Sequence, residues 1–404
     1  RIHPDPRQIE RAAEQIKKSK QPIIISGGGV LYSEAETELS EFAKKHNIPV
    51  TPTVMGIGCM DRDDPYYIGA IGCLGEGSSN SLSKDTDMAL AVGTKLGDFT
   101  TGSWSNFHNP DFQLVSINTS RFDVTKHRAT PVISDAKIGL KQLSDALGDW
   151  KAPDTWYQRS IKERNEWDAY VKKQSGPTNQ ELPSYAHAVG AVYRNADPSD
   201  IVVTAAGGLV GEVVQIWKPK QINTFETEWG FSCMGYEISG ALGMKIAKPD
   251  KDIIVFIGDG SYLLQNSDIY SSVIYDKKLI IVVCDNSGHM VINRLQLAKG
   301  GKEYLCGLKT SRASNFVEVD FAAHAKSMGA ESETVTSTSE LEVAFKRAKE
   351  SKKTYVIAIK THGYEWLEGT AFWESPTLEV HTSDENKKAY DEHLKGKNKQ
   401  RKGV

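Results

Sequence analysis

Short apolar runs with the length of single strands alternate along this chain with segments of helical periodicity. Most of the runs end in glycine-rich or polar turns, and they lie at residues 22–26, 48–51, 88–92, 112–118, 200–204, 252–258, 279–284 and 355–360. Strands that alternate with helices pair in parallel and carry helices on both faces of the sheet. We therefore predict an α/β fold built from doubly wound parallel sheets.

The chain has 404 residues, which is more than one typical domain contains. Strong strand signals stop in a charged, Trp-rich stretch that is bounded by prolines. We predict a first α/β domain at 1–150, a helical connector at 151–183 and a second α/β domain at 184–375. The remaining charged tail, 376–404, is expected to be exposed or frayed.

Charge and cysteine content exclude several classes of function. The net charge is −3, with scattered Lys and Arg residues, so no basic surface for nucleic acid is expected. The apolar runs are far shorter than the roughly 20 residues of a membrane helix. Five cysteines without a CxxC pair argue against disulfides and zinc and favour the cytoplasm. A small molecule is the expected partner.

Three strand ends in the second half carry residues suited to phosphate and to a metal ion. Gly207, Gly208 and Leu209 follow one strand, and small residues there let backbone N–H groups approach an anion. The next strand ends in Gly258, Asp259, Gly260 and Ser261, and the third is followed by Asn286. A carboxylate and an amide oxygen are ligands that Mg²⁺ accepts, so we predict a magnesium-diphosphate site.

Each of these pieces has an ordinary structural explanation, since Gly-Asp-Gly, Asp-Asn and Gly-Gly all occur in simple turns. Their combination is more specific. The residues between Gly260 and Asn286 are enough for one helix and one strand, which places both side chains at neighbouring strand ends. The triple glycine at 27–29 is different, because Tyr32 breaks the GxGxxG pattern of dinucleotide-binding proteins, and a tight turn is expected there.

The segment "GDGSYLLQNSDIYSSVIYDKKLIIVVCDN" resembles the signature of the thiamine-diphosphate-dependent enzymes. The resemblance implies that Asp259, the side chain of Asn286 and the backbone carbonyl of Gly288 bind Mg²⁺. The first residue of the closing pair is usually Asn in that family and is Asp285 here, which leaves the ligand itself unchanged.

A second segment, "EWGFSCMGYEISGALGMKIA", is similar to the part of these enzymes that holds the aminopyrimidine ring of the cofactor. The resemblance implies that Met234 supports the bent cofactor and that the carbonyl of Ser232 accepts from its amino group. Core packing is the alternative for Met234. His289 follows the metal loop and is a candidate for proton transfer, or else faces solvent. Asn293 and Arg294 are weaker candidates for binding substrate hydroxyls.

"SCMGYEISGALGMKIA", "DNSGHMVINRLQ" and "FWESPTLEV" resemble the family members that open trihydroxycyclohexane-1,2-dione in inositol catabolism. The implied activity is hydrolysis of the C–C bond between two carbonyls of this cyclic dione, to a deoxyuronic acid. Alternatives are an acetolactate-synthase-like carboligase and a chain that binds Mg²⁺ and diphosphate without catalysis. A nucleotide-binding protein is less favoured, because neither glycine cluster has the dinucleotide spacing.

The family has three α/β domains, and the resemblance assigns this chain the central and the diphosphate-binding domains. Because the sequence begins with Arg1, we expect that a pyrimidine-binding domain is absent upstream, together with the glutamate that activates the cofactor. Glu226 and Glu228 lie in the wrong domain for that role. A homodimer or homotetramer is expected, and the central domain is expected to be mainly structural.

Overall fold

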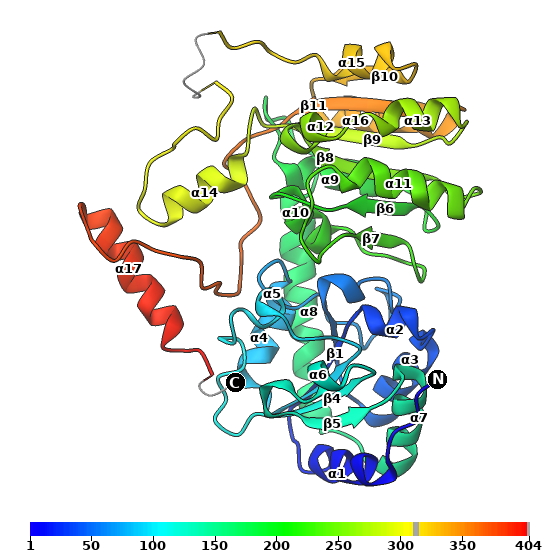
Figure 1. Cartoon of the computed structure of the whole chain (residues 1–404), viewed down its shortest axis with the longest axis vertical. Coiled ribbons are helices and arrows are strands. Elements are labelled where there is room, and N and C mark those ends of the chain that lie inside the picture. Colours follow the sequence, from blue (N-terminus) through cyan, green and yellow to red (C-terminus); the bar gives the residue numbers. More distant parts are fainter. Residues whose placement is uncertain (310–314, 402–404) are drawn as a thin grey trace.

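The computed structural model describes residues 1–309 and 315–401 and contains two all-parallel sheets with helices around them (Figure 1). Helix α8 (Asp154–Gln174) crosses the junction between the two sheets and is the connector that the charged, Trp-rich stretch predicts. The α/β class with doubly wound parallel sheets is confirmed. In the described part of the chain, no helix has the length and apolar character needed to cross a bilayer.

The first sheet has the strand order β2-β1-β3-β4-β5. Its strands are β1 (Pro22–Ser26), β2 (Val50–Pro52), β3 (Met88–Val92), β4 (Gln113–Asn118) and β5 (Thr130–Ile133). The helices of this part are α1 (Pro6–Ile16), α2 (Gly28–Tyr32), α3 (Glu36–His46), α4 (Gly77–Asp85), α5 (Asp98–Thr101), α6 (Arg121–Val124) and α7 (Ala136–Leu147), with the 3-10 turns η1 (Val54–Gly56) and η2 (Lys126–Arg128).

The second sheet has the order β10-β11-β9-β8-β6-β7. Its strands are β6 (Ile201–Thr204), β7 (Phe225–Thr227), β8 (Ile253–Gly258), β9 (Ile280–Asp285), β10 (Glu331–Val335) and β11 (Tyr355–Lys360). The helices here are α9 (Tyr185–Tyr193), α10 (Leu209–Ile216), α11 (Tyr236–Ala247), α12 (Asp259–Leu264), α13 (Asp268–Ile274), α14 (Met290–Ala298), α15 (Phe321–Ser327) and α16 (Thr338–Glu350).

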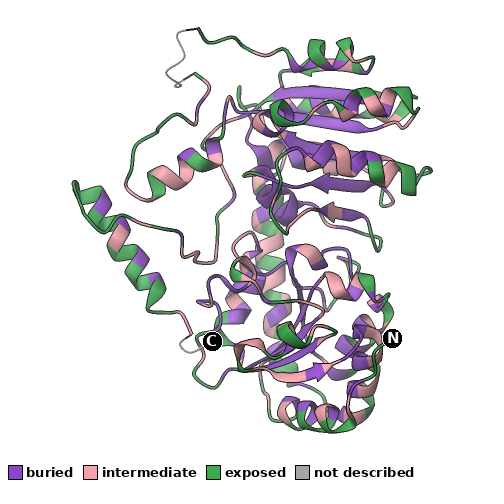
Figure 2. Ribbon diagram, viewed as in Figure 1, coloured by how far each residue is buried: buried purple, intermediate pink, exposed green. Residues whose placement is uncertain are grey.

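The strands β6, β8, β9 and β11 of the second sheet are buried on both faces, as Figure 2 shows in purple. Side chains alternate between the faces of a strand, so β8 contributes to two separate cores. Ile254 and Phe256 pack in the core that includes α9, α10 and α16, while Val255 and Ile257 pack in the core with α11 and α15. Continuous apolar runs are therefore what this sheet requires.

The triple glycine forms a close contact between two loops of the first sheet. Helix α2 begins at Gly28, directly after β1, so the expected tight turn is present. A Cβ atom on Gly29 would lie 2.6 Å from the Cα of Gly93, in the loop after β3. Side chains at these positions would push the two loops apart, which explains the glycines without a nucleotide.

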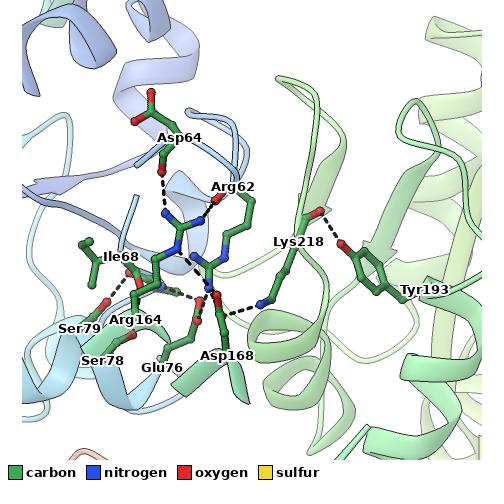
Figure 3. Close-up of polar contacts among 12 residues, drawn as sticks. Arg62, Asp64, Ile68, Glu76, Ser78, Ser79, Arg164, Asp168, Tyr193 and Lys218 are labelled. Carbon is green, nitrogen blue, oxygen red and sulfur yellow. Dashed lines mark hydrogen bonds and ion pairs between the residues drawn. The ribbon is translucent and has the colours of Figure 1, made fainter. Parts of the chain in front are cut away.

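Five charged side chains form a cluster at the junction of the two sheets, which we call the interdomain ion cluster (Figure 3). Arg62, only 2 % exposed, contacts Glu76 at 2.9 Å and Asp168 of α8 at 2.8 Å. Lys218, which follows α10, reaches the same Asp168 at 2.5 Å. Arg164 of α8 donates to the backbone carbonyl of Arg62 at 2.7 Å. The cluster thus ties the first sheet, α8 and the second sheet together.

The C-terminal tail is largely exposed, as expected, but it is not frayed. Residues Asp384–Lys397 form helix α17, and the chain then returns to the first domain (Figure 1). Gln400 donates to the carbonyl of Ser103 at 2.9 Å, and the N–H of Arg401 donates to the carbonyl of Trp104 at 3.0 Å. These polar and backbone contacts hold the exposed segment in place.

Candidate cofactor and metal site

A cavity of about 210 Å³ opens at the carboxyl ends of β6, β8 and β9. Strands β6 and β8 are neighbours on either side of the point where the strand order reverses, which is where open α/β sheets bind ligands. The residues predicted to bind the metal and the cofactor line this cavity, as does His289: Gly207, Gly208, Leu209, Ser232, Met234, Gly258, Asp259, Gly260, Ser261, Asn286, Gly288 and His289.

Asp259, Asn286 and the carbonyl group of Gly288 meet at the base of this cavity. One end of the Asn286 amide lies 2.6 Å from the hydroxyl of Tyr185. Its other end lies 3.3 Å from Oδ1 of Asp259 and 2.9 Å from the carbonyl oxygen of Gly288. Without a cation the amide nitrogen belongs at that end, because it can donate to both oxygens. A cation such as Mg²⁺ would replace this donor, with the amide oxygen turned toward the same two oxygens.

Asp259 is the only charged side chain among these three groups. It is 1 % exposed at the start of α12, and its Oδ2 accepts from the N–H of Gly288 at 2.7 Å. Burial, and then the nearby charge of Asp285, raise the pKa of Asp259 to about 7. A bound cation would favour the ionised form. Within residues 1–309 and 315–401, no group of three or more His, Cys, Asp or Glu residues could hold a metal, so a metal here would rely on one carboxylate and neutral oxygens.

The loop after β6 presents bare backbone to the cavity. Gly207 has a φ of +77° in the left-handed region, and no atom lies within 4 Å of where its Cβ would be. Gly208, by contrast, lies under the ring of Trp366, which would be 2.8 Å from an added Cβ. The open backbone at Gly207, followed by α10, fits the expected approach of a phosphate.

His289 and Met234 lie together over the start of α12. A Cβ on Gly260 would be 2.7 Å from the imidazole of His289 and 3.5 Å from the Cε of Met234, so glycine is needed for this packing. Met234 is 37 % exposed and is therefore not a core residue. Ser232 has a φ of +54° and donates from Oγ to the carbonyl of Ala205 at 2.9 Å.

Asn293 and Arg294, the weaker substrate candidates, do not line this cavity. Asn293 is fully buried, and the guanidinium of Arg294 lies 5.0 Å from the ring centre of Trp366. Both lie on α14, beyond the turn that carries His289.

Sequence reasoning missed three residues that organise the cavity. Tyr185 holds the amide of Asn286, and Trp366 packs on Gly208. Buried Glu237 accepts backbone hydrogen bonds from two of the loops that line the cavity. Glu237 lies in the segment that resembles the aminopyrimidine-holding part of the family, but that resemblance assigns it no role. Tyr185 and Trp366 lie outside both quoted segments, and their contacts join distant parts of the chain, so the sequence carried no signal for them.

Comparison with protein families agrees with this geometry. Residues 9–143 match the central domain of thiamine pyrophosphate enzymes, and residues 205–359 match their C-terminal TPP binding domain. The first match covers the first sheet, and the second covers the strands and loops around the cavity. The second domain is therefore a thiamine-diphosphate-binding domain.

Similar proteins in bacteria carry the name 3D-(3,5/4)-trihydroxycyclohexane-1,2-dione hydrolase. The protein of Lacticaseibacillus casei is 32 % identical over 97 % of this chain and 65 % of its own length. That of Clostridium tetani is 33 % identical over 100 % of this chain and 67 % of its own length. This chain thus spans about two thirds of the length of these relatives. It belongs to the thiamine pyrophosphate enzyme family.

Proposed function

We propose that the protein hydrolyses a C–C bond of trihydroxycyclohexane-1,2-dione with thiamine diphosphate and Mg²⁺. The observation that carries the proposal is the meeting of Asp259, Asn286 and the carbonyl of Gly288 beside glycine-rich loops at a strand-order reversal. The substrate rests on the name that relatives at about one third identity carry.

Each group in the cavity has a role in this proposal. Asp259, Asn286 and the carbonyl of Gly288 would hold Mg²⁺, and the hydroxyl of Tyr185, which can donate or accept, would accept from the nitrogen of Asn286 when its oxygen faces the metal. The backbone N–H groups of the loop at residues 207–209 would bind the negatively charged diphosphate. Ser261, at the start of α12, adds a hydroxyl at the same edge.

When bound, thiamine diphosphate supplies a nucleophilic carbon and an electron sink for cleaving a bond between two carbonyl carbons. Met234 offers an exposed apolar side chain that would support the cofactor, and the carbonyl of Ser232 would accept from its amino group. His289 is exposed beside Gly260, where its imidazole could transfer a proton to or from a bound reactant.

We further propose a cytoplasmic homodimer or homotetramer that acts in inositol catabolism. Free thiols support the first part, since none of the five cysteines forms a disulfide. The pathway and the assembly rest on the resemblance to the dione hydrolases.

A product assay tests the proposal. Full-length protein supplied with thiamine diphosphate and Mg²⁺ should consume the cyclic dione and release an open-chain deoxyuronic acid, and omission of Mg²⁺ should abolish the reaction. The same preparation should form no acetolactate from pyruvate. Acetolactate without ring opening would favour the carboligase, and cofactor binding without either product would favour a binding protein.

A further inference from the structure

Glu237 is a buried carboxylate that no step of the proposed function uses. It is the second residue of α11 and is 1 % exposed, although glutamate is rarely buried without a cation. Its hydrogen-bond partners are instead neutral N–H donors, and the loops that carry these donors indicate its role.

The two oxygens of Glu237 bind two different loops of the cofactor cavity. Oε2 accepts from the N–H of Gly235 at 2.8 Å, in the loop that carries Ser232 and Met234. Oε1 accepts from the N–H of Ala206 at 3.3 Å, one residue before Gly207. One side chain therefore joins the loop before α11 to the loop after β6.

A third part of the cavity reaches the same carboxylate. The hydroxyl of Ser261, two residues after Asp259, is close enough to Glu237 to help lower the pKa of its carboxyl. The three partners come from the chain segments after β6, before α11 and after β8.

The hydrogen bonds to Glu237 require a side chain that accepts at both of its terminal atoms. An ionised carboxylate can accept at both oxygens, whereas an amide of the same shape presents one N–H₂ group to a backbone donor. Buried hydrogen bonds to a charged acceptor are among the stronger ones in proteins. Burial raises the pKa of Glu237, and the N–H groups of Gly235 and Ala206 act against that rise.

We propose that Glu237 is a positioning residue, which fixes the loops at Ala206, Gly235 and Ser261 in the arrangement that receives thiamine diphosphate. This inference rests on the proposed function, because it assumes that the cavity binds that cofactor. Glu237 touches no reacting atom, and it acts through the backbone of the loops.

Glu237→Gln is the decisive variant, with Glu226→Gln as its matched control. Glu226 lies on β7, is also largely shielded from solvent, and accepts from the hydroxyl of Tyr236 at 3.3 Å without contacting a cavity loop. Titration calorimetry with thiamine diphosphate and Mg²⁺ should show an affinity loss of about tenfold or more for Glu237→Gln, and little change for Glu226→Gln. Melting temperatures of the two variants should fall by similar amounts.

Inorganic pyrophosphate separates positioning from general damage. It cannot contact the loop of Ser232 and Met234, so Glu237→Gln should weaken its binding less than that of thiamine diphosphate. Equal losses for both ligands, or wild-type affinity for both, would overturn the inference.

Hydrogen exchange on the wild-type protein provides a second test that needs no variant. The N–H groups of Ala206 and Gly235 should be protected before the cofactor is added, and protection that arises only on loading would also overturn the inference. If the wild-type protein binds no thiamine diphosphate, the proposed function fails first, and the positioning role fails with it.

Discussion

In the interdomain ion cluster every carboxylate faces a cation, whereas in the cofactor cavity the buried carboxylate of Asp259 contacts neutral groups. Glu76 and Asp168 both contact Arg62, and Asp168 also contacts Lys218 (Figure 3). Asp259 accepts from the N–H of Gly288 and lies beside the amide of Asn286. The local sequence differs as well, because Asp259 lies in the Gly-Asp-Gly signature, whereas no motif marks Glu76 or Asp168.

The difference separates a structural polar region from a binding region. Buried polar groups that satisfy one another hold parts of a fold together, and removing one leaves its partners stranded. A buried carboxylate without a cation of the chain beside it is costly, and a metal ion that binds there is one reason for keeping it. Removing such a carboxylate should therefore cost little stability and much ligand affinity.

The largest effect is expected for Arg62→Met, which removes the ion-pair partner of buried Glu76 and leaves Asp168 with Lys218. Loss of one partner from a buried ion pair costs about 3–5 kcal/mol of unfolding free energy. Urea denaturation would measure it. The control is Arg159→Met, since Arg159 pairs with Asp85 at 2.7 Å on the surface, where such pairs contribute about 0–1 kcal/mol. Similar losses for both variants would refute the structural role of the cluster.

Asp259→Ala should behave in the opposite way. It removes the one charged ligand of the proposed metal site, so affinity for thiamine diphosphate with Mg²⁺ should fall by about 100-fold, or roughly 3 kcal/mol. The unfolding free energy should stay constant or rise, because a buried carboxylate without a cation opposes folding. Calorimetry measures the affinity, and urea denaturation of the same preparation measures the unfolding free energy. An unchanged affinity would show that Asp259 is not a metal ligand.

The central strands could be predicted from the sequence because burial on both faces gives them continuous apolar runs. Strands β1, β3, β8 and β9 follow such runs closely. The strands β5, β7 and β10 were missed, since they lie at sheet edges, have three to five residues and are partly exposed. Edge strands need no apolar run, so they cannot be predicted from the apolar pattern of the sequence.

The site was predictable where it consists of strand ends, because parallel strands bring their carboxyl ends to one edge of a sheet. Asp259 and Asn286 follow paired strands, so their meeting follows from topology alone. Tyr185 lies 101 residues from the Asn286 that it orients, and nothing local marks such a contact. The order at the end of the C-terminal tail could not be predicted for a related reason, since its contacts are with Ser103 and Trp104, which are distant in the sequence.

Glu212→Gln tests a third situation. Its buried carboxyl is neither paired with a cation nor grouped with the proposed metal ligands. Its Oε1 accepts from the N–H of Leu367 at 2.9 Å, while its Oε2 has no hydrogen-bond partner among the described residues. Burial raises the pKa of Glu212 to about 7 from a model-peptide value of 4.5. The folded protein therefore binds this proton more tightly than the unfolded chain does.

The sign of the effect follows from that difference. The contribution of Glu212 to stability is fully present below about pH 4.5 and is lost as the pH rises through about 7, where the folded group ionises. Glu212→Gln should thus raise the unfolding free energy by about 2–3 kcal/mol near pH 8 and change it little near pH 5. Urea denaturation at both pH values measures this, and an equal change at each would contradict it.

The smallest effect is expected for Asp285→Asn, although Asp285 lies next to the metal ligand Asn286. Its Oδ1 accepts from the N–H of Ser287 at 2.8 Å, and an asparagine oxygen can keep that bond. Loss of the negative charge weakens the general attraction for Mg²⁺, but it also removes the repulsion that Asp285 exerts on Asp259. These two effects oppose each other, so affinity for thiamine diphosphate with Mg²⁺ should change by no more than about threefold. The same calorimetric titration as for Asp259→Ala measures it. A loss as large as that of Asp259→Ala would mean that Asp285 is itself a ligand, and that the metal ligands have been identified incorrectly.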